Sequence, residues 1–302
     1  MKLIYKDFNK ENWFLVSWTL SNKCNYQCSY CPAHLHSGST GQPKWDDVSN
    51  FVKDLKIPEK EICFRLSGGE PTYWKHFVNL AKLVKSQGHI FSFLTNGSRS
   101  VDYYKEIGKY TDGMMISYHS EYSDASHFAD IVKAIDCVVV INLMMMPGQF
   151  GELLKVAKTI FNASDNVMIW PKVILDKSAA QGHITNELYS YSDEEQSILS
   201  NWPYFRKLDD YNLHRGAMLF NDEEVTANDL ILRDLNNHKG WNCWAGIDMI
   251  NVDMWGTVYR ADCKQGGPLG NLTEYTLPTS THVCNTDKCA CLSDIYLRKE
   301  LR

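Results

Sequence analysis

From residue 14 to residue 173, the chain alternates short apolar runs with amphipathic segments, a pattern that few architectures satisfy. The runs are rich in β-branched and aromatic residues, and the segments between them carry apolar side chains at helical spacing. We expect strands at 14–20, 62–67, 90–96, 114–119, 137–146 and 167–173, and helices at 46–56, 75–88, 101–108, 124–135 and 150–162. Strands that are apolar on both faces predict a parallel sheet covered by helices, so the fold class is α/β, a partial or closed barrel.

The pattern divides the chain into three parts. Residues 1–175 hold the barrel, and residues 176–240 form a polar connector with a helix expected at 191–202. Residues 241–302 are rich in Gly, Cys and short strands, which indicates a small domain held together by a metal. In barrels of this kind the chemistry lies at the carboxyl ends of the strands, so the segments after these ends should surround one mouth.

Charge and hydropathy exclude several classes of function. The net charge is −5, from 31 basic and 36 acidic residues, and there is no run of five like charges. This disfavours extended nucleic-acid binding. The N-terminal segment lacks the features of a signal peptide, and no apolar run approaches the roughly 20 residues that cross a bilayer. We therefore expect a cytoplasmic protein that does not enter a membrane.

Ten cysteines are distributed unevenly along the chain. In a reducing compartment, such a number indicates metal ligation or catalysis rather than disulfides. Three cysteines lie within residues 24–31 and five lie between residues 243 and 291. Cys63 and Cys137 stand alone in apolar runs, where we expect small buried hydrophobic side chains.

Cys24, Cys28 and Cys31 have the spacing C-x3-C-x2-C directly after the first expected strand. Three thiolates in one loop can hold a 4Fe–4S cluster while one iron stays free of a protein ligand, and a catalytic metal needs such an open position. The alternative is a zinc knuckle in which His34 or His36 supplies a fourth ligand.

This triplet resembles the hallmark of the radical S-adenosylmethionine (SAM) superfamily, C-x3-C-x-aromatic-C, with Tyr30 at the aromatic position. The resemblance continues after the second strand, where a segment similar to the family's GGEP motif is made of Ser67, Gly68, Gly69, Glu70 and Pro71. Paired glycines let a backbone approach a ligand closely, and a carboxylate can receive an ammonium group. The resemblance implies that this segment binds the amino group of SAM.

Further resemblances follow at the next two strand ends. Asn96, in the sequence Thr-Asn-Gly, and Ser117 match positions that contact SAM in the family, although a turn residue and a barrel-facing polar residue are the plainer interpretations. His119 and Glu121 follow at the mouth and are candidates for an acid or base beside the substrate. The three methionines at 144–146 are expected in the barrel core, and the Gly-, Ser- and His-rich loop at 32–43 is either a lid, a phosphate-contacting turn or a plain loop.

The resemblance implies a mechanism and its cofactors. An electron from the 4Fe–4S cluster enters the sulfonium of SAM, and the C5′–S bond breaks. The resulting 5′-deoxyadenosyl radical then removes a hydrogen atom from a substrate carbon. The protein positions the reactants and excludes water, since the cofactor carries the difficult chemistry. A reductant such as flavodoxin or ferredoxin is the expected partner.

The second cysteine group resembles the twitch or SPASM domains that follow many radical SAM barrels and bind auxiliary 4Fe–4S clusters. The resemblance begins at Cys243, with a Gly-turned hairpin expected before Cys263. Five cysteines suffice for one cluster with one to spare, which favours the twitch form, and four of the five would ligate: Cys243, Cys263, Cys284, Cys289 and Cys291. A zinc site is the alternative.

Two substrate classes compete. Members of the family that modify peptides often carry a leader-binding domain, and only 23 residues precede Cys24 here. We therefore expect the oxidation of a small molecule, with the auxiliary cluster accepting an electron. Maturation of a peptide with a separate leader-binding partner is the second candidate, and a non-catalytic zinc or electron-transfer protein is the third.

Overall fold

Six parallel strands in chain order form the frame of the molecule. The computed structural model describes residues 3–6, 13–174, 190–204, 217–225, 227–289 and 292–302. The frame strands are β2 (Trp13–Thr19), β3 (Glu61–Ser67), β4 (Ile90–Thr95), β5 (Gly113–Tyr118), β6 (Val138–Met144) and β7 (Val167–Lys172). Each pairs in parallel with the next, which confirms the six predicted runs within two residues. Among the described strands β7 pairs with β6 alone, so the α/β barrel is partial.

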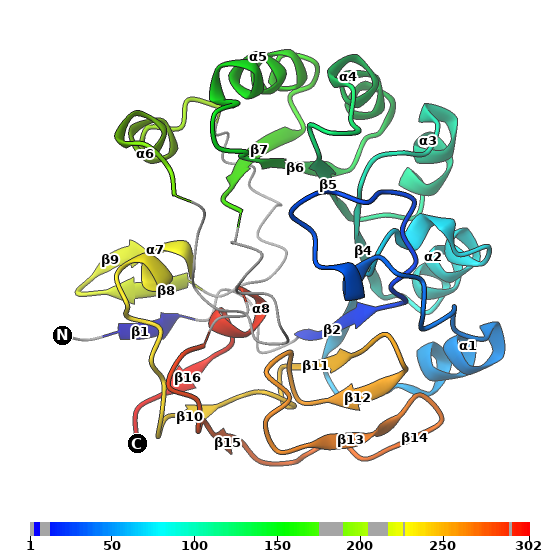
Figure 1. The fold of residues 1–302 in the computed structure, drawn as a ribbon. Helices are drawn as coiled ribbons and strands as arrows, with labels where there is room; N and C mark the ends of the chain where they lie inside the picture. Colours follow the sequence, from blue (N-terminus) through cyan, green and yellow to red (C-terminus); the bar gives the residue numbers. More distant parts are fainter. Residues whose placement is uncertain (1–2, 7–12, 175–189, 205–216, 226, 290–291) are drawn as a thin grey trace.

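Five helices cover the outer side of these strands (Figure 1). They are α1 (Trp45–Asp54), α2 (Phe77–Ser86), α3 (Val101–Gly108), α4 (Ala125–Ala134) and α5 (Phe150–Phe161), as predicted from the spacing of apolar side chains. On α1, for example, Val48, Phe51 and Val52 are buried on one face. The side chains of Ser100 and Asp124 accept hydrogen bonds from the first turns of α3 and α4, which explains where these two helices begin.

Both faces of the sheet are buried, each in its own apolar cluster. On β2, the side chains of Phe14, Val16 and Trp18 join the large cluster that includes the helices. Trp13 and Leu15 point the other way, into a second cluster that contains residues of the C-terminal part. This two-sided burial is why the strands read as continuous apolar runs.

The two solitary cysteines lie within the packed interior. Cys63 is fully buried in the inner cluster, as predicted. Cys137 is half-buried and packs against the outer cluster.

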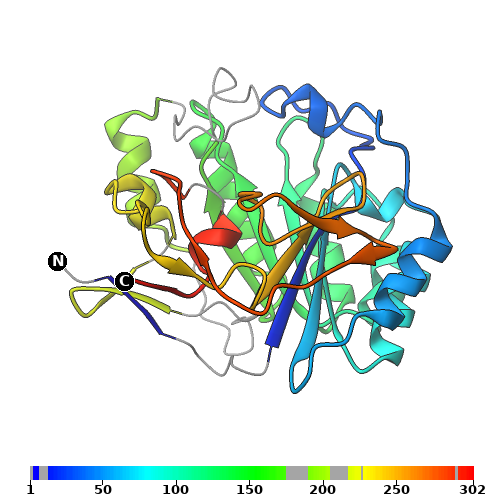
Figure 2. The ribbon, with the colours of Figure 1, turned by 90° about the horizontal axis from the view of Figure 1, so that it is seen from below.

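The C-terminal part extends the barrel sheet. Strand β11 (Met249–Val252) pairs in parallel with β2, and it forms the expected hairpin with β12 (Thr257–Tyr259). Strands β13 (Pro268–Asn271) and β14 (Glu274–Tyr275) complete a sheet of ten described strands, which Figure 2 shows from below. The region expected as a small separate domain is therefore continuous with the barrel through β11.

Two smaller sheets lie beside this frame. Strand β1 (Leu3–Lys6) pairs with β8 (Ala217–Phe220), which pairs with β9 (Glu223–Val225), and β10 (Asn242–Cys243) lies between β15 (His282–Val283) and β16 (Lys299–Glu300). The remaining helices are η1 (Ala33–Leu35), η2 (Pro71–Tyr73), α6 (Asp193–Ser200), α7 (Ala227–Leu232) and α8 (Leu292–Ile295). Helix α6 confirms the helix predicted at 191–202. Within the described ranges, no helix is long and apolar enough to cross a membrane.

Gly97, two residues after the end of β4, lies where helix α4 packs closely on this frame. Its φ is +74°, and a Cβ added there would lie 2.6 Å from a ring carbon of Phe128 and 2.9 Å from Ile116. We expect Gly97→Ala to lower the free energy of unfolding by on the order of 2 kcal/mol or more, because left-handed backbone strain adds to overpacking. Urea denaturation of the apoprotein measures this loss.

The matched control is Gly151→Ala, on α5, where an added Cβ meets nothing within 4 Å and φ is not positive. This variant should be no less stable than the parent. Equal unfolding midpoints for both variants would contradict the packing described at Gly97.

Candidate functional site

The cysteine loop, residues 20–31, lies at the carboxyl end of β2, as the sequence predicted. Cys28 is buried, Cys24 and Cys31 are half-buried, and the backbone N–H of Cys31 donates to the carbonyl of Cys28 at 3.0 Å. The loop packs in a small apolar cluster whose members are Tyr26, Cys28, Tyr30, Cys31, Met144, Met146 and Ile174. Met145, between the two methionines, belongs to the outer core instead. The cysteine loop therefore covers the end of β6 as well as that of β2.

Gly68 and Gly69, which follow β3, pack directly against the backbone of the cysteine loop. The N–H of Gly69 donates to the carbonyl of Ser21 at 2.9 Å, and that of Glu70 donates to the carbonyl of Lys23 at 2.8 Å. A Cβ on Gly69 would lie 2.4 Å from the carbonyl oxygen of Lys23, and one on Gly68 would lie 2.5 Å from that of Ser21. The sequence predicts that these glycines approach a ligand; in this structure the group that they approach is the backbone of the cysteine loop.

The Glu70 carboxylate ties together the ends of β3 and β4. It is only 2% exposed, and its Oε1 accepts from the N–H of Thr72 (3.1 Å), from the hydroxyl of Thr72 (2.6 Å) and from the hydroxyl of Thr95 (2.8 Å). Its Oε2 accepts from the N–H of Asn96 at 2.6 Å. Burial raises the pKa of Glu70, and these four bonds act in the opposite direction. Each carboxylate oxygen has two lone pairs, and the described residues give Oε2 only the N–H of Asn96, so Oε2 has a second acceptor position that suits an ammonium group.

The other two residues of this segment, Pro71 and Ser67, contact neighbouring parts of the chain. Pro71 begins the short helix η2, and the Ser67 hydroxyl lies 3.4 Å from the Thr19 hydroxyl on the neighbouring strand.

Asn96 and Ser117 stand at the next two strand ends. The Asn96 amide donates to Oδ1 of Asn25 at 2.9 Å and lies 3.8 Å from the Cys24 sulfur, so it contacts the cysteine loop. Ser117 is half-buried on β5. Its neighbour Tyr118 packs against Phe128 of α4, on the outside of the sheet. Because side chains alternate along a strand, Ser117 faces the barrel interior.

His119 and Glu121 contact the cysteine loop from the opposite side. The Tyr30 hydroxyl and Nδ1 of His119 are 2.5 Å apart, and the N–H of Ser29 donates to Oε2 of Glu121 at 2.7 Å. Burial lowers the pKa of His119 to about 4, so its imidazole is neutral near pH 7. In this structure His119 contacts the ring hydroxyl of Tyr30 and Glu121 binds the backbone of Ser29. Both side chains therefore hold the cysteine loop in place.

The loop at 32–43 is organised by Asn22, a residue that the sequence analysis did not single out. The buried Asn22 amide donates to the carbonyl of His34 at 2.8 Å and to the hydroxyl of Ser37 at 2.9 Å, while its oxygen accepts from Thr40. An open hollow of about 560 Å³ separates this loop from Cys24, and its lining residues are Lys23, Cys24, Gln27, His36, Ser37, Gly38, Gly41 and Gln42. Its volume is within the range of ligand pockets.

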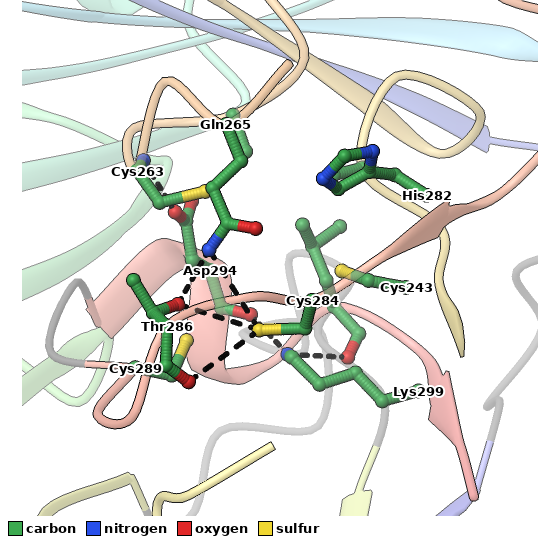
Figure 3. A pocket seen from close by; sticks show the side chains of 12 residues that line it. Cys243, Cys263, Gln265, His282, Cys284, Thr286, Cys289, Asp294 and Lys299 are labelled. Carbon is green, nitrogen blue, oxygen red and sulfur yellow. Dashed lines mark hydrogen bonds between the residues drawn. The ribbon is translucent and has the colours of Figure 1, made fainter. Parts of the chain in front are cut away.

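Cys243, Cys263, Cys284 and Cys289 surround one small cavity (Figure 3). They come from four different segments, beginning with β10 and the turn after β12. Cys291, the fifth member of the predicted set, lies outside the described residues. Tertiary structure thus brings together four thiols that are up to 46 positions apart in the sequence, from Cys243 to Cys289.

Burial disfavours the thiolate form of three of these thiols. Burial raises the pKa of Cys243 and Cys263, and it raises the pKa of Cys289 to about 12. In the first loop, burial likewise raises the pKa of Cys28 to about 12. A metal binds the thiolate, so metal binding here would release protons. The positive charge of the metal would offset the negative charge of the thiolates, which burial disfavours.

The number of thiols in each group suits an iron–sulfur cluster. A 4Fe–4S cluster takes one thiolate per iron, and one iron can stay open where only three thiolates are present. The first loop offers three thiols, and the lining of the cavity offers four.

Several residues of these sites carry no local sequence signal. Thr72 and Thr95 bind Glu70, and Asp294 and Lys299 line the second cavity (Figure 3). Only Thr95, directly before Asn96, could have been found from its position in a motif.

Comparison with known proteins agrees with this geometry. Residues 18–160 match the family model of the Radical SAM superfamily. A protein of Selenomonas ruminantium described as an S-adenosylmethionine-dependent nucleotide dehydratase is 30% identical over 86 residues. That match covers 28% of this chain and 30% of the relative, so it spans less than a third of the relative's length.

Two solved structures share the fold over most of the chain. Native anSMEcpe with bound AdoMet and Cp18Cys peptide has a TM-score of 0.52 at 18% identity, covering 88% of this chain and 78% of that chain. Streptococcus suis SuiB bound to its precursor peptide SuiA has a TM-score of 0.53 at 13% identity, covering 94% and 65%. The match to the Radical SAM superfamily thus covers residues 18–160, the part of the chain that forms the partial barrel and carries the cysteine loop at its mouth.

Proposed function

We propose that the protein holds a 4Fe–4S cluster through Cys24, Cys28 and Cys31, cleaves SAM reductively and uses the radical to remove a hydrogen atom from a substrate carbon. The observation that carries this proposal is the cysteine loop itself. Its three thiols occupy one loop at the barrel mouth, and the loop is fixed from both sides by Glu70 and its neighbours and by His119 and Glu121. When bound, the cluster supplies the electron that breaks the C5′–S bond of SAM.

The residues around the loop would bind and orient SAM. The remaining acceptor position of Glu70 suits the SAM ammonium group, and Asn96 stands beside Cys24. Ser117 faces the barrel interior, where the substrate would lie. The proposed SAM-binding set is Tyr30, Ser67, Gly68, Gly69, Glu70, Pro71, Asn96 and Ser117. Because the loop is already held by hydrogen bonds, little conformational entropy is lost when SAM binds.

We assign an auxiliary 4Fe–4S cluster to the second cysteine group. We choose Cys243, Cys263, Cys284 and Cys289 as its ligands because all four line one cavity, and we propose Cys291 as the spare cysteine. A centre of this kind would accept an electron from the substrate radical, so the net reaction would be an oxidation or dehydrogenation.

A small-molecule substrate is the first choice. The relative named as a nucleotide dehydratase supports this class, although the match covers under a third of that protein. A peptide is the second candidate, because two structures that share the fold hold peptides. Formation of 5′-deoxyadenosine that rises with added peptides, and not with added nucleotides, would favour the second candidate.

Electrons would come from a cytoplasmic reductant such as flavodoxin or ferredoxin. The open hollow beside Cys24 brings solvent close to the cluster-binding loop, and its rim carries the exposed ammonium group of Lys23. An acidic electron carrier would suit a rim of this charge.

Anaerobic reconstitution tests the proposal directly. With iron and sulfide, the protein should take up roughly eight irons, and with dithionite and SAM it should form 5′-deoxyadenosine. Replacement of Cys24, Cys28 and Cys31 by Ala should abolish SAM cleavage and leave roughly four irons. Bound zinc without SAM cleavage would refute both assignments.

A double-mutant cycle tests the roles of Tyr30 and His119. If the two act as one tether on the cysteine loop, Tyr30→Phe and His119→Phe should each slow SAM cleavage by about fivefold, the worth of a hydrogen bond of ~1 kcal/mol. The double variant should be no slower than the singles, because both remove the same bond.

Tyr110→Phe, at the end of α3 and away from the mouth, is the control and should retain the parent rate. If the effects of the two variants multiply instead, His119 acts independently of Tyr30. That outcome would restore the acid–base role predicted for His119 from the sequence.

The choice of auxiliary ligands is testable by paired substitutions. Cys289→Ala removes a thiol from the cavity and should lose roughly four irons. Cys291→Ala should retain them. Iron content and the electronic absorption of the reconstituted proteins distinguish the two variants, and the reverse result would show that Cys291 is the ligand.

A further inference from the structure

We propose that Lys299 is a fixed counter-charge of the auxiliary centre and that it raises the reduction potential of that centre. This inference rests on the auxiliary cluster proposed above. Lys299 is not one of the proposed cluster ligands, and it belongs to none of the sequence motifs described above.

Lys299 is buried in the wall of the four-thiol cavity. The residue is only 2% exposed, and it lines the same cavity as Cys243, Cys284 and Cys289 (Figure 3). Lysine is almost never fully buried without a compensating partner, so this placement demands an explanation.

Neutral acceptors hold the ammonium group in place. It donates to the backbone carbonyls of Asp294 (2.5 Å), Ile295 (3.2 Å) and Leu297 (3.0 Å). The ring of Tyr5 lies on another side, with its centroid 5.0 Å from the nitrogen. These contacts satisfy the three N–H donors without cancelling the charge, so its field reaches the cavity.

Other ionisable groups also lie in and beside the wall of the cavity. Asp294 presents the opposing charge, and its carboxylate accepts from the N–H groups of Asp262 (3.1 Å) and Cys263 (2.7 Å), on the Cys263 side of the cavity. His238 and His282 have lowered pKa values because they are buried, so neither adds positive charge near pH 7. Lys299 is therefore the buried cation among the described residues that line this cavity.

Lys299 lies close to the thiols in the structure. It pairs with Cys243 across β16 and β10, and both residues line the cavity with Cys289. A cluster held by four thiolates is negatively charged, and reduction adds a further negative charge. A nearby cation in a weakly polar interior stabilises the reduced form more than the oxidised form, and net charge is one of the factors that set such potentials. A higher potential would make the centre a better acceptor of the substrate radical's electron.

A purely structural role is the competing explanation. The three carbonyls belong to the end of the short helix α8 and the turn that follows, so the ammonium also caps a helix end. Capping alone would affect stability and would leave the potential unchanged. The potential is therefore the measurement that separates the two explanations.

The experiment uses the full chain with Cys24, Cys28 and Cys31 replaced by Ala, so that only the auxiliary cluster gives a signal. In this background, redox titration followed by electron paramagnetic resonance measures the midpoint potential with and without Lys299→Met. We expect the substitution to lower the equilibrium constant for reduction at least tenfold, a shift of 59 mV or more for one electron. Lys299→Arg should keep the potential near that of the parent.

Lys239→Met is the matched control, since this lysine belongs to the same region but its side chain is 59% exposed and screened by solvent. The midpoint potential of the auxiliary cluster should not change in this variant. Lys299→Gln, which keeps a donor for the carbonyls, replaces the Met variant if that variant does not fold.

Either of two results would overturn the inference about Lys299 without affecting the proposed function. One is a normal cluster with an unchanged potential in the neutral variants. The other is failure of both neutral variants to bind iron although circular dichroism shows them folded, because Lys299 would then be required for assembly. Failure of the proposed function looks different, since the parent background would then bind no cluster at all.

Discussion

The buried carboxylate of Glu70 is the contact on which the arrangement of the mouth depends. It accepts hydrogen bonds from Thr72, Thr95 and Asn96, and therefore joins the ends of β3 and β4. The N–H of the same residue donates to Lys23 in the cysteine loop, so a third strand end is joined as well. A carboxylate is tolerated in the interior only when donors such as these bind it. Its neighbours are consequently held in one geometry before any cofactor binds.

The opposite side of the cysteine loop is held by different chemistry. There the Tyr30 hydroxyl meets His119, the backbone of Ser29 meets Glu121, and the sulfurs of Met144 and Met146 pack against the loop. The loop is thus clamped between β3–β4 on one side and β5–β6 on the other. A cluster that must keep one iron open needs such support, because three ligands from a single loop do not define its orientation alone.

One strand pair connects the two cysteine groups. Strand β2 leads into the first cysteine loop, and its parallel neighbour β11 lies between Cys243 and Cys263 in the sequence. The register aligns Val252 with Trp18 and Ser17 with Asn251, so the C-terminal part is attached to the barrel by backbone hydrogen bonds and shared core packing. A rigid connection of this kind suits two redox centres that would exchange electrons with one substrate.

The sequence by itself determined the strands and helices of the barrel, because periodicity and local capping are properties of neighbouring residues. It also determined the cysteine loop and the glycines that support it, because their spacing is short. Tertiary structure alone decided which side chains surround them. Thr72 meets Glu70 locally, but Thr95, His119 and Glu121 reach the site only because parallel strands end at one edge of a sheet. Cys243, Cys284 and Lys299 likewise meet through the pairing of β10 with β15 and β16, and no periodicity in the chain records contacts between segments so far apart.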